Sequence, residues 1–174
     1  MTLNQEVILA LARKSIKNFD SLPSREKVLQ IVALLADKIK VREDEGNNRG
    51  YWIDDFNRVA GVPLGSPWCG AMLTWTFDIF DMPKPKYGAS VASWVSWARA
   101  HDLIVKDPRR SDLCAWLNDT GTGHIGQVVS VIPGFIQSIE GNTTPGPLGN
   151  QRDGAGCYRR RRLKKTWEYY IRIV

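Results

Sequence analysis

The sequence predicts a single α+β domain in which N-terminal helices pack on a small antiparallel β-sheet. Three observations support this fold class. The 174 residues suffice for one domain, and 43% hydrophobic residues with seven Trp indicate a chain that folds around a core. Apolar residues recur every three or four positions up to about residue 100. From about residue 112, short β-rich runs alternate with Gly, Pro and Asn, and helices followed by strands are typical of an α+β fold.

The first two expected helices show the helical spacing most clearly. In the first, Val7, Leu11 and Ile16 would share the buried face, and the helix would end before residues 21–23. The second carries five apolar residues at intervals of three and four. They are Val28, Ile31, Val32, Leu35 and Ile39.

Three shorter helices are expected next. The third covers about residues 52–59. The fourth opens with Ser66 as its N-cap and Pro67 in the first helical position, which places Cys69 in its first turn. The fifth begins at a Ser90 cap.

Five strands are expected in the second half of the chain. They are 113–117, 125–132, 135–140, 157–163 and 167–174. The Gly- and Pro-rich stretch 143–156 between two of them is expected to be a long surface loop, and loops of this length often border functional sites.

Charge is unevenly distributed. The chain has a net charge of +6, and all of this excess lies in residues 151–174. The basic run consists of Arg159, Arg160, Arg161 and Arg162, followed by Lys164 and Lys165. In a strand, alternate arginines face opposite sides. An ordered, solvated strand that attracts anionic envelope polymers is the favoured interpretation, and phosphate contacts to nucleic acid are the alternative.

The cysteines and the N-terminus indicate the cellular compartment in which the protein is made. Cys69, Cys114 and Cys157 are an odd set without a CxxC pair, so we expect reduced thiols and neither a disulfide framework nor a zinc site. The acidic pair 54–55 alone does not suggest calcium, and we expect no metal and no cofactor. The apolar run 7–12 lacks a basic leader, so we expect synthesis in the cytoplasm without a signal peptide.

Cys69 is the candidate nucleophile. A thiol reacts as its thiolate, and the free N–H groups and dipole at a helix N-terminus lower the pKa of a cysteine there. The alternative is a small buried core residue, and a nearby general base would distinguish the two. Only His101 and His124 are available. His101 lies at a helix end, where we expect it to have a structural role. His124 lies between glycines at the start of a strand and is the better candidate base.

Glu140 and Asn142 are the candidates for the group that orients the histidine. If the backbone is extended there, a spacing of two residues puts both side chains on one face of the sheet. A hairpin turning near residues 133–134 would bring them back beside His124. The alternative is that Glu140, Gly141 and Asn142 merely open a loop.

Five short motifs in this order resemble the CHAP domain, a small papain-like group of cysteine amidohydrolases related to the NlpC/P60 peptidases. They are Gly-Ser-Pro-Trp-Cys at 65–69, Ser-Asp-Leu at 111–113, Gly-His-Ile-Gly at 123–126, Glu-Gly-Asn-Thr at 140–143 and Gly-Cys-Tyr-Arg-Arg at 156–160. The resemblance implies a papain-like α+β fold for residues 47–174, with residues 1–46 as a helical accessory segment.

The resemblance also implies functions for individual residues. Cys69 would be the nucleophile, His124 the base, and Glu140 with Asn142 the groups that orient it. Trp68 is a candidate substrate-binding residue, and we expect a monomer.

The sequence is most similar to phage endolysins, which cleave an amide bond in peptidoglycan after release to the cell wall. Two alternatives within the same chemistry are an injected antibacterial amidase effector and a protein amidohydrolase. A non-catalytic nucleic-acid-binding or phage structural protein is the alternative from another class.

Overall fold

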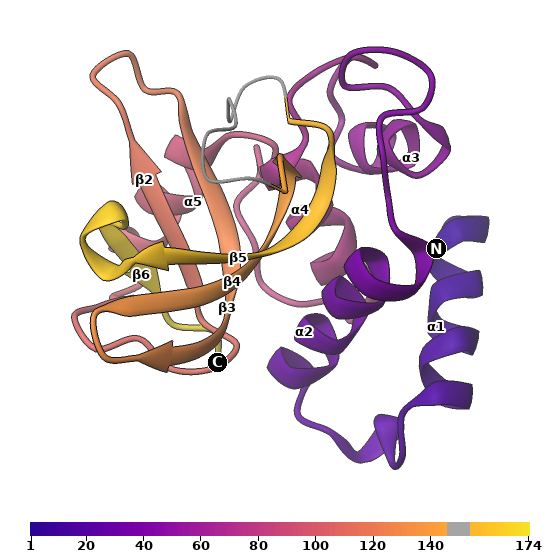
Figure 1. The fold of residues 1–174 in the computed structure, drawn as a ribbon, viewed down its shortest axis with the longest axis horizontal. Helices are drawn as coiled ribbons and strands as arrows, with labels where there is room; N and C mark the ends of the chain where they lie inside the picture. Colours follow the sequence, from indigo (N-terminus) through magenta and orange to yellow (C-terminus); the bar gives the residue numbers. More distant parts are fainter. Residues whose placement is uncertain (146–153) are drawn as a thin grey trace.

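In a computed structural model, residues 1–145 and 154–174 are described, and they form an α+β fold (Figure 1). Most of the expected loop 143–156 lies outside the described residues. The helices are α1 (Leu3–Ser15), α2 (Ser24–Leu34), α3 (Tyr51–Val59), α4 (Cys69–Ile79) and α5 (Val91–Ala100). Three short helical turns are η1 (Phe19–Ser21), η2 (Leu35–Ile39), which continues α2, and η3 (Lys164–Thr166).

The strands of the described residues form one antiparallel sheet in the order β1-β6-β2-β3-β4-β5. Their bounds are β1 (Ile104–Val105), β2 (Leu113–Leu117), β3 (Gly123–Ile132), β4 (Phe135–Thr143), β5 (Gly156–Leu163) and β6 (Tyr169–Ile171). β2 to β5 match the expected runs closely. The two-residue β1 was not predicted. The expected strand 167–174 is reduced to β6, which pairs with β1 and β2.

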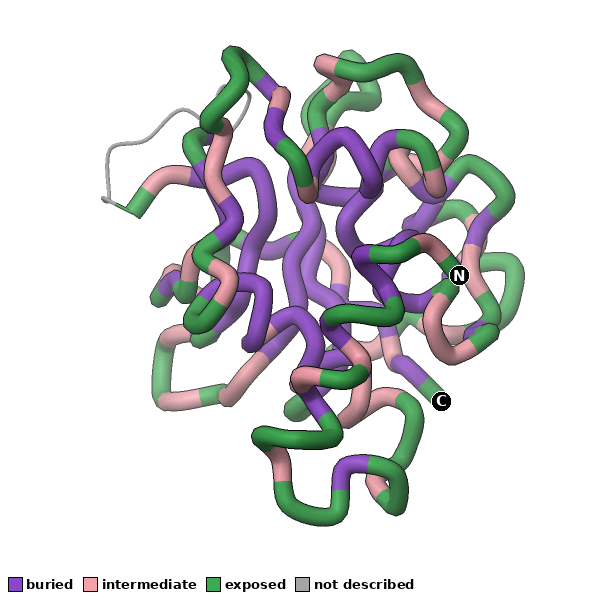
Figure 2. Tube along the Cα trace, turned by 90° about the vertical axis from the view of Figure 1, so that its right-hand side faces the viewer, coloured by how far each residue is buried: buried purple, intermediate pink, exposed green. Residues whose placement is uncertain are grey.

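One hydrophobic core lies between the helices and one face of the sheet. α2, α4 and α5 contact the central strands, and buried segments run through the middle of the molecule while exposed ones form its loops (Figure 2). Helices before and after residue 46 both contribute side chains to this core. Ile8 and Val28 come from the first part of the chain, and Trp75 comes from the second. The two parts of the chain therefore share a core, whereas their division into an accessory segment and a domain stays a prediction.

The buried face of α1 differs from the one expected. Ile8 and Ala12 are fully buried, whereas Val7 is 48% exposed. The rotation of the helix is set by polar contacts: Thr2 and Gln5 form a capping box, and the Gln5 side chain donates a hydrogen bond to the carbonyl of Trp75. The face that carries Gln5 and Ile8 consequently points inward.

The opposite face of the sheet carries a second, smaller cluster. It consists of Cys114, Val128, Ile136, Trp167 and Tyr170. The C-terminal segment containing η3 supplies two of these side chains. His124 lies on this face as well, where its ring stacks on Trp167.

Candidate active site

Cys69 is the first residue of α4. The helix begins with Trp68 in the N-cap position, and the first helical hydrogen bond runs from the N–H of Met72 to the carbonyl of Trp68. Ser66 is therefore not the N-cap that the sequence suggested. Its hydroxyl instead donates to the Pro63 carbonyl at 2.6 Å and closes the turn before the helix. Cys69 still lies where free N–H groups and the helix dipole favour a thiolate.

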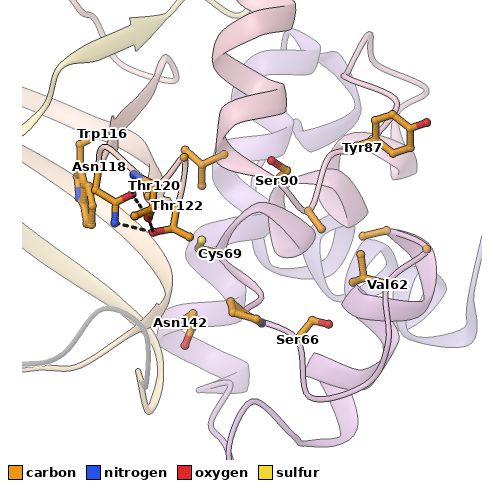
Figure 3. Close-up of a pocket in the computed structure, with 17 residues that line it drawn as sticks. Val62, Ser66, Cys69, Tyr87, Ser90, Trp116, Asn118, Thr120, Thr122 and Asn142 are labelled. Carbon is orange, nitrogen blue, oxygen red and sulfur yellow. Dashed lines mark hydrogen bonds between the residues drawn. The ribbon is translucent and has the colours of Figure 1, made fainter.

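Cys69 lies on the wall of a pocket of about 810 Å³. One side is formed by residues 60–67, a second by residues 87–91, and a third by the hairpin between β2 and β3 (Figure 3). At the hairpin tip, Asn118, Thr120 and Thr122 are joined by side-chain hydrogen bonds. The described residues that line the pocket include no Asp, Glu, Lys, Arg or His. The pocket therefore offers hydroxyl, amide and backbone groups to a ligand.

His124 lies on β3, opposite Trp116 of β2, and its side chain is fully buried. Its Nε2 is 2.9 Å from Oε2 of Glu140 on the neighbouring strand β4. The close approach requires a glycine at position 126, because a Cβ there would lie 2.7 Å from Cγ of Glu140. The hairpin of β3 and β4 thus brings Glu140 beside His124.

The other ring nitrogen of His124, Nδ1, is buried and forms no conventional hydrogen bond within residues 1–145 and 154–174. With Nε2 engaged by Glu140, Nδ1 is the nitrogen left for the thiol of Cys69, which interacts with the imidazole. The side chains of Cys69, His124 and Glu140 therefore lie in a row that runs from the pocket wall to the interior of the sheet. In this arrangement the carboxylate fixes the ring and its tautomer, as a nucleophile–base pair requires.

The pKa values of these groups are coupled. Burial opposes ionisation of Cys69, but its interaction with the neighbouring imidazole of His124 and the positive charge there outweigh burial and lower the pKa of the thiol. Burial also disfavours a charged His124, yet its interactions with Cys69 and Glu140 raise its pKa to about 9. Burial would raise the pKa of Glu140, but His124 and Arg162 lower it to about 2. All three shifts favour the thiolate, the imidazolium and the carboxylate over their neutral forms.

Arg162 is a part of this site that the sequence analysis placed at the surface. Its Nε and Nη2 lie 2.8 and 2.6 Å from the two carboxylate oxygens of Glu140, and the hydroxyl of Ser138 donates to Oε1 at 2.6 Å. The signal that could have found it is the buried Glu140 itself, because a carboxylate inside a sheet needs a cation, and Arg162 lies in the next expected strand.

The indole rings of Trp116 and Trp167 both lie near His124. The centroid of Trp116 is 6.4 Å from that of the imidazole, and Trp167 stacks at 6.4 Å with an interplanar angle of 24°. Arg162 lies over Trp167, with 5.9 Å from its Cζ to the ring centroid.

Asn142 is turned differently from Glu140. Its backbone adopts φ +52°, and the register of β4 and β5 shifts between Glu140 and Thr143, so the expected alternation of a regular strand breaks here. The side chain lies at the pocket (Figure 3). Its Oδ1 accepts a hydrogen bond from the N–H of Gly154, and its buried Nδ2 has no partner in the described part of the chain. Glu140, and not Asn142, contacts His124.

Trp68 does not face the pocket, contrary to its expected part in substrate binding. The side chain is fully buried, its Nε1 donates to Oε1 of Glu43 at 3.0 Å, and its ring packs on Phe56. Gly141 lies against the ring so closely that a Cβ would be 2.7 Å from it. As the N-cap residue of α4, Trp68 directs its indole into the core and not into the pocket.

The remaining candidates lie apart from the site. Cys114 and Cys157 are free and buried, and burial raises the pKa of both thiols. His101 is exposed, and its Nδ1 is 2.8 Å from the Trp97 carbonyl. Within the described ranges, His, Cys, Asp and Glu side chains form no group of three or more that could hold a metal ion, and no helix is long and apolar enough to cross a bilayer.

The four arginines of β5 alternate between the two faces, as expected for a strand. Arg159 pairs with Asp37 at 2.6 Å, and Arg161 is exposed and lies over the Phe135 ring. Arg160 is buried and its guanidinium hydrogen-bonds the carbonyl of Thr144. Arg160 and Arg162 are therefore turned toward the interior, whereas Arg159 and Arg161 are exposed.

The chain matches no model of a known protein family, no curated protein and no solved structure.

Proposed function

We propose that the protein is a papain-like, CHAP-type cysteine amidohydrolase that cleaves an amide bond in the peptide of the bacterial cell wall. The observation that carries the proposal is the alignment of Cys69, His124 and Glu140 behind one pocket. The thiol opens a helix, the imidazole is buried and held by a carboxylate, and the pocket gives a peptide access to the sulfur. These are the features that nucleophilic cysteine catalysis requires.

In the proposed reaction the Cys69 thiolate attacks the carbonyl carbon of the substrate amide. The backbone N–H of Cys69, at the start of α4, is the candidate donor to the resulting oxyanion. His124 gives its proton to the amine as the C–N bond breaks, which leaves the acyl group on sulfur. Water then attacks the thioester, His124 takes up the water proton, and cleavage of the C–S bond restores the thiolate and the imidazolium.

The pocket suits an extended peptide with many amide groups. Its uncharged hydroxyl and amide side chains, from Ser66, Asn118 and Thr120 among others, offer hydrogen bonds to a peptide backbone. The enzyme would act as a monomer on peptidoglycan after release or injection. An endolysin, an injected effector and a protein amidohydrolase share this chemistry and differ in the substrate they meet.

Digestion of purified sacculi, followed by mass spectrometry of the released fragments, tests the proposal and identifies the bond. Wild-type protein should release new amino and carboxyl termini. Cys69→Ala should lose at least about a thousandfold in rate, because the nucleophile is removed. Cys157→Ala is the matched control, since this buried thiol does not line the pocket.

Undiminished activity of Cys69→Ala would overturn the assignment of the nucleophile. Absence of any released fragment would overturn the proposed substrate. If wild-type protein instead hydrolysed only protein amides, the protein amidohydrolase would be the better interpretation. Salt-dependent DNA binding without hydrolysis would favour the non-catalytic alternative.

A further inference from the structure

Arg162 does not line the pocket, but it contacts the carboxylate that holds His124. Two nitrogens of its guanidinium meet the two oxygens of Glu140, at 2.8 and 2.6 Å, and its Nη2 also lies 3.3 Å from the hydroxyl of Thr143. The Arg162 side chain is 14% exposed and that of Glu140 is fully buried. A two-point contact of this kind fixes both the position and the plane of a carboxylate.

We propose that Arg162 is a positioning residue that acts through Glu140 to hold His124 in the orientation and charge state needed for cysteine catalysis. The effect of Arg162 on catalysis rests on the proposed function. Its physical basis is the contact itself, which links the basic strand β5 to the site.

The proposed reaction cycle explains why the Glu140 carboxylate needs Arg162 as a second cation besides His124. Within residues 1–145 and 154–174, the carboxylate of Glu140 directly contacts the imidazole of His124 and the guanidinium of Arg162. When His124 gives up its proton to the leaving amine, it no longer compensates the buried carboxylate. Arg162 cannot lose its proton in the physiological range, so Glu140 stays ionised throughout the cycle. An ionised Glu140 can then stabilise the imidazolium again when water is activated.

Other charged and titratable groups surround Glu140. They are Arg160 and Cys157 on β5, Cys114 on β2, and Cys69 on α4 beyond the imidazole. Burial keeps Cys114 and Cys157 as neutral thiols. Arg160 adds positive charge from the same strand, whereas Arg162 contacts both carboxylate oxygens and thereby also sets their orientation.

A measurement without substrate isolates this effect. The rate at which iodoacetamide alkylates Cys69, followed against pH, reports formation of the thiolate–imidazolium pair. In Arg162→Gln, the low-pH limb of this profile should move up by about one pH unit or more, because Glu140 is protonated more readily without the guanidinium. Arg162→Lys keeps the charge without the two-point contact and should fall between wild type and Arg162→Gln.

NMR titration gives a second substrate-free readout. The chain contains two histidines, so exposed His101 serves as the internal reference for His124. The low-pH step of the His124 signal, which reports protonation of Glu140, should move up with the alkylation profile in Arg162→Gln. Arg161→Gln is the matched control, since this exposed neighbour lies over Phe135 and its profile should equal that of wild type.

Wall digestion supplies the catalytic readout. Arg162→Gln should lower kcat about tenfold or more at neutral pH with KM unchanged, because Arg162 is absent from the pocket lining. Wild-type alkylation and titration profiles in folded Arg162→Gln would overturn the inference, as would loss of the fold in both Arg162 variants. If wild type cleaves no wall peptide but the profiles shift, the proposed function fails and the positioning by Arg162 stands.

Discussion

At the scale of single residues, the site is a row of groups with alternating charge. Cys69, His124, Glu140 and Arg162 follow one another from the pocket wall inward. His124 contacts Glu140, Glu140 contacts Arg162, and the thiol of Cys69 interacts electrostatically with the imidazole. Burial disfavours every charge in the row, and only the neighbours of opposite sign offset that cost. Removing one member therefore leaves its neighbours buried and uncompensated.

The pH dependence of stability follows from the two pKa shifts in this row. Glu140, lowered from 4.5 to about 2, stabilises the folded state above about pH 4.5, and this contribution is lost as pH falls toward 2. His124, raised from 6.5 to about 9, contributes fully below about pH 6.5 and loses its contribution as pH rises through 9. The contribution of the pair to the free energy of unfolding should be largest between these limits.

Glu140→Gln tests this expectation. At pH 5.5 the variant should lose about 3–5 kcal/mol in the free energy of unfolding, because His124 and Arg162 lose their buried counter-charge. The difference from wild type should shrink toward both pH 2 and pH 9. Urea unfolding across this range measures it, with Glu45→Gln at an exposed site as control. A difference that stays constant with pH would contradict the assigned ionisation states.

At the scale of elements, the pocket depends on how closely α4 approaches the segment 87–91. A Cβ on Gly70 would lie 2.6 Å from the carbonyl oxygen of Ala89, and one on Gly88 would lie 2.0 Å from Oγ1 of Thr74. Glycines at these positions let the helix that carries Cys69 lie directly against a wall of the pocket. The hairpin of β3 and β4 supplies the other half of the site.

Gly70→Ala tests the contact between α4 and this wall. Helix propensity alone would make the variant about 1 kcal/mol more stable. We expect the opposite, a loss of about 1–3 kcal/mol together with reduced activity, because the backbone carbonyl of Ala89 cannot move freely.

Thermal unfolding and wall digestion are the measurements. Asp78→Ala on the same helix removes only a surface ion pair with Lys84, and it should change stability by less than about 1 kcal/mol. A stabilised and fully active Gly70→Ala would show that the close approach is not needed.

At the scale of the whole molecule, the N-terminal helices and the rest of the chain share one core. Ile8, Val28 and Ile31 are fully buried in the same cluster as Trp75. Polar contacts reinforce this, since Thr2 donates to Asp55 at 2.6 Å and Trp75 donates to the same carboxylate at 2.8 Å. α1 and α2 therefore support the helix that carries Cys69.

Removal of residues 1–46 should abolish cooperative folding of the remainder, because it exposes the core under α3 and α4. Near-ultraviolet circular dichroism and dye binding to exposed apolar surface check this outcome. Ile31→Ala in the full-length chain is a less disruptive test. It should lower the free energy of unfolding by about 2–5 kcal/mol. If residues 47–174 alone unfolded cooperatively and cleaved peptidoglycan, the helices would be an accessory segment as the sequence suggested.

The sequence by itself determined what depends on neighbouring residues. Helical spacing located α2, the Ser90 cap located the start of α5, and β-rich runs located β2 to β5, because periodicity and caps are local. The same local signals placed Cys69 at a helix start and Glu140 at the end of a hairpin strand opposite the one that begins with His124. Both placements agree with the structure.

Only the tertiary structure decided which residues meet across the sheet. Arg162 reaches Glu140 through the pairing of β4 with β5, and Trp167 reaches His124 because η3 turns the chain back. The inward turn of Trp68 and the left-handed backbone of Asn142 likewise follow from packing around them. Such contacts depend on strand register, helix rotation and the charge balance of a buried site, which are set by the whole fold and not by any short stretch of sequence.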